Sequence, residues 1–302
     1  MKMVVVFGAG LAGMQYIINC PSDEKIVAIV DNNWENINKI CGYEVSSPDK
    51  IIGLDFDKIV IAIGNKNKTQ ALSVLQIFDQ LKNMGVDESK MIVPNENAPN
   101  LEGLCEYGMP RIQFIYDFAK LVCTRNIEGS LAECGVWRGD YAYHINNAFP
   151  DRKLYLFDTF EGFPEEQLEI EDDNVRQKLS SSNQAIKESY ITHETLAFLK
   201  CKNRENGKII IKKGRVPDTF ADMPDDRFVY VQLDMDIYVP TIAALHYFAK
   251  RMTAGGVIAV HDYYAGYGFW TGVRKALDEF LVAYPLTRAV PIGDGATLLL
   301  LF

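Results

Sequence analysis

The sequence has little of what marks a metal-clustered, secreted or membrane-spanning protein. Its six cysteines are scattered without CxxC or other metal-ligand spacing, and several lie in apolar runs, so they are expected to be reduced core thiols. No run of about 18 apolar residues is present. The opening MKMVVVFGAG leads directly into a strand and a glycine turn, without a signal-peptide core. These absences predict a cytoplasmic protein without a membrane span.

Basic charge is also scarce. The 31 lysines and arginines are outnumbered by 40 aspartates and glutamates, which gives a formal net charge of −9. Nucleic acids and anionic membranes bind to basic faces, so neither partner is expected. With 48% hydrophobic and 24% charged residues the composition is that of an ordinary globular protein, and 302 residues favour two domains.

The first hundred residues alternate between apolar strand patterns and helical patterns, which is typical of a parallel sheet with helices on both faces. Strands are expected at 3–10, 25–33, 57–64 and 91–94, and helices at 11–20 and 69–85. A segment rich in Pro, Asn and Gly at 94–103 then indicates a boundary. We predict a Rossmann-like, nucleotide-binding-type domain over 1–97, followed by a linker and connecting helix over 98–125.

A glycine motif, GAGLAG, directly follows the first of these strands and opens a helix. Gly8, Gly10 and Gly13 have GxGxxG spacing, and Asp31 ends the second strand. In a dinucleotide-binding fold such glycines admit a pyrophosphate at the helix N-terminus, and the acid binds the ribose. Binding of NAD or another nucleotide is therefore one interpretation, and tight packing of strand against helix is the other. In FGAG and VDNN the segment resembles small Rossmann-like domains at the front of sugar-modifying enzymes.

A second alternating series occupies 126–302 and predicts a seven-strand sheet. Strands are expected at 130–139, 153–162, 208–214, 228–234, 255–262, 286–292 and 296–302, and helices at 140–149, about 185–200, 241–253 and 270–284, while the helical pattern at 109–122 is expected to form the connecting helix before this series. IGDGA joins the last two strands, which predicts a hairpin and an antiparallel strand. The polar segment 165–184 is too long for a normal connection and is interpreted as a mobile lid.

The start of this series fits a cofactor that has a ribose and an amino-acid tail. Glu133 ends the first strand and precedes Gly135 and Gly139, while Asp158 ends the next strand, where an acid can bind both ribose hydroxyls. This combination is typical of enzymes that bind S-adenosylmethionine (AdoMet). Each acid alone has another interpretation, since Glu133 could cap a helix and Asp158 could cap a turn.

Acids and a histidine follow two later strands. Asp234 and Asp236 lie in VQLDMDIYVPT, and His261 and Asp262 end GGVIAVHD. Because parallel strands end at one edge of a sheet, Asp234, His261 and Asp262 are expected to converge on a cation. Carboxylates favour Mg²⁺, whereas imidazole favours Zn²⁺, Fe²⁺ or Mn²⁺. A substrate proton could pass to Asp234, which we favour, or to His261 or Asp236. Asp236 could equally cap the next helix.

Six blocks carry a family resemblance: AECGVWRG, FDTFEGFP, KKGRVPDTF, LDMDIYVPT, GGVIAVHDYY and GVRKALDEF. In these blocks residues 108–302 resemble the macrocin O-methyltransferase (TylF-type) family, which methylates sugar hydroxyls on antibiotics and related glycosides. The resemblance implies AdoMet, a divalent cation that is usually Mg²⁺, a sugar or glycoside as acceptor, and a homo-oligomer. The Rossmann-like front domain suggests a nucleotide-linked sugar as the acceptor. The implied cofactor contacts are Glu133, Gly135, Gly139, Asp158 and Thr159, with Gly214 and Arg215 beside the adenine.

One departure from that family leaves alternatives open. The family usually has two adjacent acids where this chain has His261 and Asp262, so a metal-free transfer that uses the histidine stays open. The first hundred residues are expected to lie outside the family pattern. Residues 1–97 could instead serve an NAD-dependent or bifunctional nucleotide-sugar enzyme, although they lack a His, Lys or Tyr arrangement for hydride transfer. A non-catalytic nucleotide-binding module is the third interpretation.

An aromatic run follows the histidine strand directly. It borders the predicted active edge of the sheet, so it is interpreted either as a wall on which a sugar stacks or as ordinary core. The members of the run are Tyr263, Tyr264, Tyr267, Phe269 and Trp270.

Overall fold

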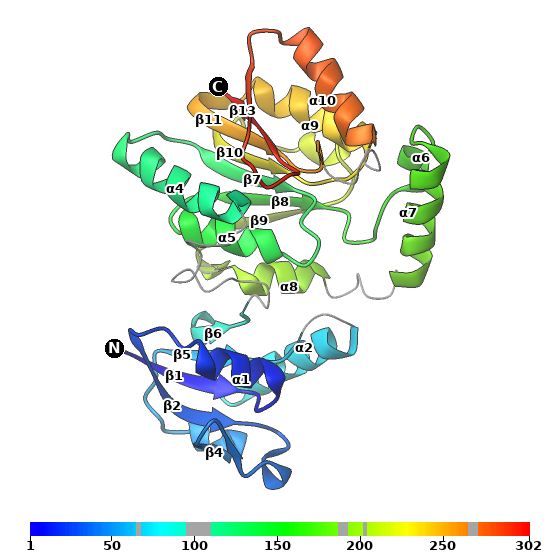
Figure 1. Cartoon of the computed structure of the whole chain (residues 1–302). Helices are drawn as coiled ribbons and strands as arrows, with labels where there is room; N and C mark the ends of the chain where they lie inside the picture. The colour runs from blue at the N-terminus through cyan, green and yellow to red at the C-terminus, as the bar shows by residue number, and fades with distance from the viewer. Residues whose placement is uncertain (65–67, 95–109, 187–192, 202–203, 265–270) are drawn as a thin grey trace. The chain divides into compact units, whose positions relative to one another are not determined.

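The computed structural model describes residues 1–302 except 65–67, 95–109, 187–192, 202–203 and 265–270. The chain divides into two compact units, Met1–Asn100 and Leu101–Phe302. Each unit contains one mainly parallel sheet with helices packed on it, so the predicted α/β class is confirmed (Figure 1). No helix within the described ranges combines the length and the apolar character that crossing a bilayer requires.

The first unit has a six-stranded sheet. Its elements are β1 (Lys2–Phe7), α1 (Leu11–Ile18), β2 (Glu24–Val30), β3 (Lys39–Ile40), β4 (Tyr43–Ser46), β5 (Lys58–Ile61), α2 (Lys68–Asn83) and β6 (Met91–Ile92). The strand order is β3-β4-β2-β1-β5-β6, and every pair is parallel except β3 with β4. Val4, Val5 and Val6 of the central strand are all fully buried, which is why this strand reads as a continuous apolar run.

The second unit has a seven-stranded sheet in the order β12-β13-β11-β10-β7-β8-β9. Its strands are β7 (Ser130–Cys134), β8 (Leu154–Asp158), β9 (Ile209–Lys213), β10 (Phe228–Leu233), β11 (Met252–Val260), β12 (Arg288–Pro291) and β13 (Leu298–Leu301). Its helices are α4 (Pro110–Thr124), α5 (Asp140–Ala148), α6 (Glu165–Leu168), α7 (Asp173–Ile186), α8 (His193–Lys200), α9 (Tyr238–Ala249) and α10 (Thr271–Ala283). β13 is antiparallel to both neighbours, so the predicted seven strands and antiparallel last strand are confirmed.

Alternate residues of each central strand enter different cores. Leu131 and Leu156 lie in the core formed with α4, α5 and α8, whereas their neighbours Ala132 and Phe157 lie in the core formed with α9 and α10. The sheet is thereby covered on both faces, and α4, which was expected as a connecting helix, packs on the second unit's sheet as part of that unit (Figure 1). Residues 98–109 of the predicted linker lie outside the described residues.

The polar segment interpreted as a lid loop is instead mostly helical. It forms α6 and most of α7, whose residues Leu168, Val175 and Leu179 are buried and pack with Ile237. Val175 and Leu179 are four residues apart and share one stripe of α7, whereas Leu168 belongs to α6, and the polar residues around them obscured the pattern. The segment therefore packs directly on the loop that follows β10.

The cysteines are not all in the core. Cys134 and Cys201 are buried, but Cys41 and Cys123 are exposed, so the expectation of core thiols is wrong for the latter two. Cys41 lies in the turn between β3 and β4, and Cys123 lies on the outer side of α4. Apolar neighbours in the sequence were misleading because a helix turns its adjacent residues to different sides.

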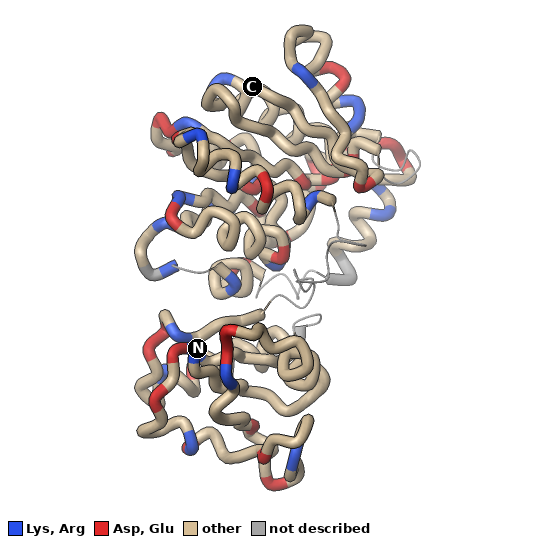
Figure 2. Tube along the Cα trace, turned by 60° about the vertical axis from the view of Figure 1, so that its left-hand side comes forward, with Lys and Arg blue, Asp and Glu red and all other residues tan. Residues whose placement is uncertain are grey.

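Charged residues of both signs are interspersed along the chain in the view of Figure 2. Several form exposed ion pairs, such as Lys120 with Asp117 at 2.9 Å and Lys153 with Asp226 at 3.3 Å. Each such pair contributes only about 0–1 kcal/mol to stability. The chain seen from this side carries its acidic excess without a continuous stretch of one sign.

Candidate active site at the carboxyl edge of the second sheet

The structure brings Asp234, His261 and Asp262 together at the carboxyl edge of the seven-stranded sheet. The Nδ1 atom of His261 lies 3.0 Å from Asp234 Oδ1 and 3.2 Å from Asp262 Oδ2. The strands that precede these residues, β10 and β11, are adjacent and parallel, and the His261 N–H donates to the carbonyl of Leu233. The backbone therefore fixes all three side chains at the edge where open α/β sheets bind ligands.

The ring nitrogen of His261 is an unusual atom in this cluster. Nδ1 is buried and makes no hydrogen bond of ordinary geometry within the described residues, although two carboxylate oxygens lie beside it. One donor atom from each of the three residues lies within 4.8 Å of the others. Adjacent ligands of a small octahedral cation lie about 3 Å apart. The three donors are thus suited to share a divalent cation.

Within the protein alone, the charges of this cluster compensate one another. Burial lowers the pKa of His261, but the adjacent carboxylates of Asp234 and Asp262 outweigh it and raise the pKa to about 10. Burial favours a high pKa for Asp234, but His261 and Arg111 hold that pKa below its usual value. Burial, the charge of Asp234 and a hydrogen bond with Asp262 raise the pKa of Asp236 well above its usual value. A cation that binds here must displace the imidazole proton.

An arginine that no sequence pattern singled out reaches the same cluster. Arg111, in the first turn of α4, donates from Nη1 to Asp234 Oδ2 at 2.8 Å, and the two side chains are 20% and 22% exposed. Its guanidinium lies 4.5 Å from the ring centre of Tyr141. The pair is separated by 123 residues in the sequence. A local motif could not reveal it, because helix α4 meets the sheet only in the folded chain.

Several non-glycine residues around the strand ends have left-handed backbone conformations. The φ angle is +50° at Trp137, +51° at Phe160, +66° at Asp236 and +65° at Asp262. Each such residue carries on the order of 1–3 kcal/mol of strain, and strained residues cluster at functional sites. Two of the four belong to the loop segments that present the acidic residues, which supports a functional role for this edge.

The loop between β7 and α5 packs closely against its neighbours and follows a buried acid. A Cβ on Gly135 would overlap the carbonyl oxygen of Asp234, and one on Gly139 would lie 2.5 Å from the Cα of Ala197. Glu133 is 1% exposed, and its Oε2 has no hydrogen-bond partner among the described residues. Burial and the charge of Asp234 raise the pKa of Glu133 well above its usual value. A buried carboxylate with a free oxygen is suited to receive a cationic group such as an ammonium.

Asp158 ties this loop to the next strand. Its Oδ2 accepts hydrogen bonds from the N–H groups of Val136 at 2.7 Å and Trp137 at 2.8 Å, and its Oδ1 accepts one from Phe160 at 2.8 Å. Burial raises the pKa of Asp158, although the three N–H donors act to lower it. The acid therefore has a structural role within the chain, and its predicted contact with a ribose stays a prediction.

The other predicted cofactor residues lie at the same edge but have partners within the protein. The hydroxyl of Thr159 donates to the carbonyl of Gly162 at 2.6 Å, and Gly214 donates its N–H to the carbonyl of Asp158 at 2.9 Å. Arg215 forms an ion pair with Glu166 of α6. The structure thus places Gly214 next to Asp158, and it directs Arg215 toward the α6–α7 segment.

Comparison with known families decides the affiliation of the chain. Residues 58–295 match the Macrocin-O-methyltransferase (TylF) family. The chain belongs to this family. The match begins at residue 58, so the expectation that the first hundred residues lie outside the family pattern is wrong. Residues 1–92 match the family "C2185-like, N-terminal". The resemblance to front domains of sugar-modifying enzymes is therefore not supported, because FGAG and VDNN are too short to be specific.

Named relatives of this TylF-family chain are O-methyltransferases. The 8-demethyl-8-(2,3-dimethoxy-alpha-L-rhamnosyl)-tetracenomycin-C 4'-O-methyltransferase of Streptomyces olivaceus is 25% identical over 62% of this chain and 71% of the relative. The Mycinamicin III 3''-O-methyltransferase of Micromonospora griseorubida is 26% identical over 52% of this chain and 63% of the relative. The solved structure of the O-methyltransferase NovP superposes with a TM-score of 0.52 at 22% identity, covering 64% and 80% of the two chains, and shows the shared fold. The chain is thus an enzyme of the O-methyltransferase class.

The glycine motif of the first unit is explained in part by packing within the chain. A Cβ on Gly8 would lie 2.6 Å from the backbone that follows β5, and one on Gly13 would overlap the carbonyl oxygen of Gly8. Around Gly10 the space is open. Asp31 accepts a hydrogen bond from the N–H of Ala9 at 2.7 Å, so its carboxylate already holds the glycine turn. Binding of NAD or another nucleotide here stays a prediction.

The aromatic run is described only at its start. Tyr263 and Tyr264 pack edge to face with ring centres 4.7 Å apart, and Tyr264 is 44% exposed. The remaining members, Tyr267, Phe269 and Trp270, lie outside the described residues. Whether the run forms a sugar-stacking wall stays a prediction.

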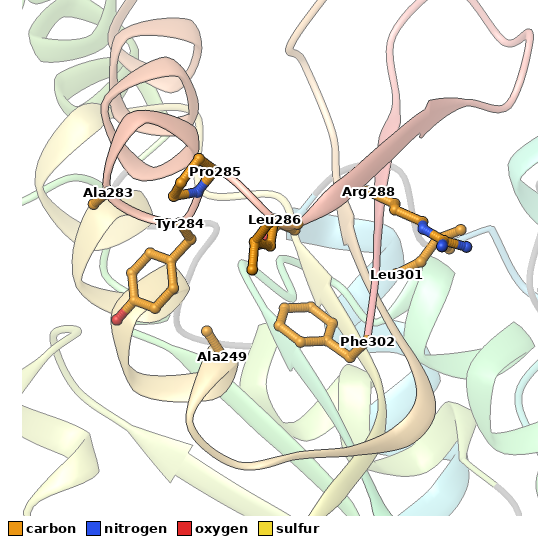
Figure 3. A pocket seen from close by; sticks show the side chains of 9 residues that line it. Ala249, Ala283, Tyr284, Pro285, Leu286, Arg288, Leu301 and Phe302 are labelled. Carbon is orange, nitrogen blue, oxygen red and sulfur yellow. The ribbon is translucent and has the colours of Figure 1, made fainter.

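A pocket of about 710 Å³ lies away from the acidic cluster (Figure 3). The N–H of Gly255 donates to the carbonyl of Phe302, so this pocket borders the first half of β11, whereas His261 follows its end. The lining residues are Ala249, Ala283, Tyr284, Pro285, Leu286, Thr287, Arg288, Leu301 and Phe302. The pocket is therefore at the opposite edge of the sheet from the candidate site.

Glu171, between α6 and α7, links this segment to the loop after β10. Its Oε1 accepts a hydrogen bond from the N–H of Tyr238 at 2.6 Å, and its carboxylate fills the space beside Gly272, near the start of α10. We expect Glu171→Ala to destabilise the second unit by about 1–3 kcal/mol, because the Tyr238 N–H loses its acceptor. Thermal unfolding measures this, with the exposed Glu169→Ala as control. Equal unfolding midpoints for the two variants would show that the Glu171 side chain does not stabilise the second unit.

Proposed function

We propose that this TylF-family enzyme transfers the methyl group of AdoMet to a hydroxyl of a sugar, a glycoside or a nucleotide-linked sugar, with help from a divalent cation. The observation that carries the proposal is the convergence of His261, Asp234 and Asp262 beside the buried, partly unpartnered Glu133. The relatives' names support the acceptor class, since one names a rhamnosyl compound as its substrate.

The loop between β7 and α5 supports AdoMet as the methyl donor. Glu133 offers a carboxylate oxygen to the ammonium of the methionine tail, and Gly135 and Gly139 let the loop pack closely on Asp234 and Ala197. We propose that Asp158, which ends the next strand, accepts hydrogen bonds from the ribose hydroxyls in addition to those from the loop. When bound, AdoMet supplies an electrophilic methyl group on a sulfonium.

Asp234, His261 and Asp262 would hold the divalent cation. Two carboxylates and one imidazole suit Mn²⁺ or Fe²⁺ at least as well as Mg²⁺, and both types remain candidates. When bound, the cation lowers the pKa of a coordinated substrate hydroxyl and orients its oxygen. The three side chains are held by strand ends, so they position the acceptor without rearrangement of the sheet.

Asp236 is the residue that we propose as the proton acceptor. Both oxygens of Asp234 have neighbours, with Arg111 at Oδ2 and His261 at Oδ1. Asp234 is therefore better suited to bind the cation than to accept the substrate proton. Asp236 lies two residues further along the same loop, where its left-handed backbone turns it back toward Asp262. General-base catalysis of this kind contributes about 10²–10⁴-fold to the rate.

Removal of the cation tests whether methyl transfer requires it. With AdoMet and a panel of nucleotide sugars and glycosides, we expect mass spectrometry to detect acceptors that gain one methyl group. EDTA should reduce that transfer on the order of 10²-fold, and Mn²⁺ or Mg²⁺ should restore it, because the cation stabilises the developing alkoxide by several kcal/mol. Full activity in EDTA, with no metal found by elemental analysis, would instead favour the metal-free transfer that uses His261.

A further inference from the structure

We propose that Arg111 is a positioning residue: it holds one oxygen of Asp234 so that the other faces the cation site. This inference rests on the proposed function, because it assigns a role at that site. The contact itself is direct, from Nη1 of Arg111 to Oδ2 of Asp234 at 2.8 Å, and it joins α4 to the end of β10.

Arg111 is itself held in place by a buried network. Its carbonyl accepts a hydrogen bond from the Tyr141 hydroxyl at 3.2 Å, and its guanidinium stacks on the same ring. The Tyr141 hydroxyl lies 3.0 Å from that of Tyr230, which donates to Gln232 Oε1 at 2.8 Å. Tyr230 and Gln232 are fully buried in β10, the strand that Asp234 directly follows. The guanidinium is therefore fixed relative to the carboxylate that it contacts.

Because of the guanidinium, the two oxygens of Asp234 have different partners. Oδ2 is taken by Arg111, and Oδ1 lies 3.0 Å from His261 Nδ1. The terminal torsion of a free aspartate is broad, so an unheld carboxylate would rotate or offer both oxygens at once. Hydrogen-bonded partners of this kind orient metal-ligating carboxylates, and their removal typically reduces metal affinity or activity by about 10–100-fold.

An arginine is suited to this position because its charge is permanent. A guanidinium stays protonated at any working pH, and its planar donors match a carboxylate. The fixed positive charge of Arg111, 2.8 Å from Asp234 Oδ2, also favours the ionised form of Asp234 and so holds down the pKa of that carboxyl. Lysine would keep the charge but not the planar geometry. A plain structural ion pair between α4 and the sheet would not depend on that difference.

The test uses the full chain with Arg111→Gln, Arg111→Lys and the control Lys120→Gln. Lys120 lies on the same helix, is 75% exposed and pairs with Asp117. We expect Arg111→Gln to bind Mn²⁺ about 10–100-fold more weakly in calorimetry and to lower kcat on an acceptor found in the screen. AdoMet affinity should not change, Arg111→Lys should recover part of the loss, and Lys120→Gln should behave like the unsubstituted enzyme.

Three outcomes contradict the proposal or separate it from the proposed function. Arg111→Gln with unchanged Mn²⁺ affinity and kcat would overturn it. So would an equal loss of AdoMet and Mn²⁺ affinity, since that pattern indicates general damage to the fold. If the unsubstituted enzyme binds no Mn²⁺ and works in EDTA, the cation part of the proposed function fails. The kcat of Arg111→Gln at constant AdoMet affinity then decides the role of Arg111. If Arg111→Gln does not fold, Arg111→Lys supplies the same measurements.

Discussion

Replacement of Asp236 by asparagine is expected to lower kcat by about 10²–10⁴-fold while AdoMet affinity stays the same. Asparagine has nearly the same shape, tolerates the left-handed backbone at this position, where φ is +66°, and cannot take up a proton. The change therefore removes the ability to accept a proton and little else. Initial rates at saturating AdoMet, together with calorimetric AdoMet titration, measure the two quantities separately.

The matched control for this variant is Asp151→Asn. Asp151 is 91% exposed and belongs to the same unit, so the substitution removes the same charge at a distance from the site. If Asp236→Asn keeps a kcat within about threefold of the unsubstituted enzyme, the proton must pass elsewhere. Asp236 would then be a residue that shapes the loop, which is the alternative that its sequence position left open.

Replacement of Gly135 by alanine is expected to abolish detectable AdoMet binding and to destabilise the second unit by about 2–6 kcal/mol. Two effects add: the new Cβ overlaps the carbonyl of Asp234, and the backbone has φ of +86°. Overpacking costs about 1–3 kcal/mol, and a left-handed alanine costs a similar amount. To relieve the overlap, the glycine loop must move away from the strand end that presents Asp234, so the cofactor loop and the cation site are disturbed together.

Gly207→Ala separates these two effects. Gly207 also has a left-handed backbone, with φ of +70°, but a Cβ there meets nothing within 4 Å. This control should cost only about 1 kcal/mol and keep AdoMet affinity. The thermal midpoint and its shift by AdoMet measure both variants. Equal midpoints for Gly135→Ala and Gly207→Ala would mean that close packing at Asp234 does not constrain the loop.

Much of the fold could be predicted because its strands are long and buried. β10 has six fully buried residues in succession, and the apolar run that reveals it also fixes where Asp234 follows. β3 and β4 escaped prediction, since two to four residues with mixed burial leave no periodic signal. The lid segment was misread because only three buried residues of α6 and α7 carry the pattern.

Only those site residues that directly follow the strands of the sheet could be predicted from the sequence. Asp234, His261 and Asp262 meet because adjacent parallel strands end together, a rule that needs no knowledge of side-chain contacts. Arg111 and Glu171 could not be found this way, since each comes from a helical segment that docks on the site from a distance in the sequence. Their roles depend on packing, which no local pattern encodes.

Titration of the full chain with AdoMet in a calorimeter is the most direct measurement of the central claim. We expect saturable binding that weakens by about 10–100-fold in Asp158→Ala, because charged hydrogen bonds of this kind contribute about 1.5–3 kcal/mol. An absence of heat at millimolar AdoMet, with the protein folded, would contradict the assignment of this sheet edge as an AdoMet-dependent methyltransferase site.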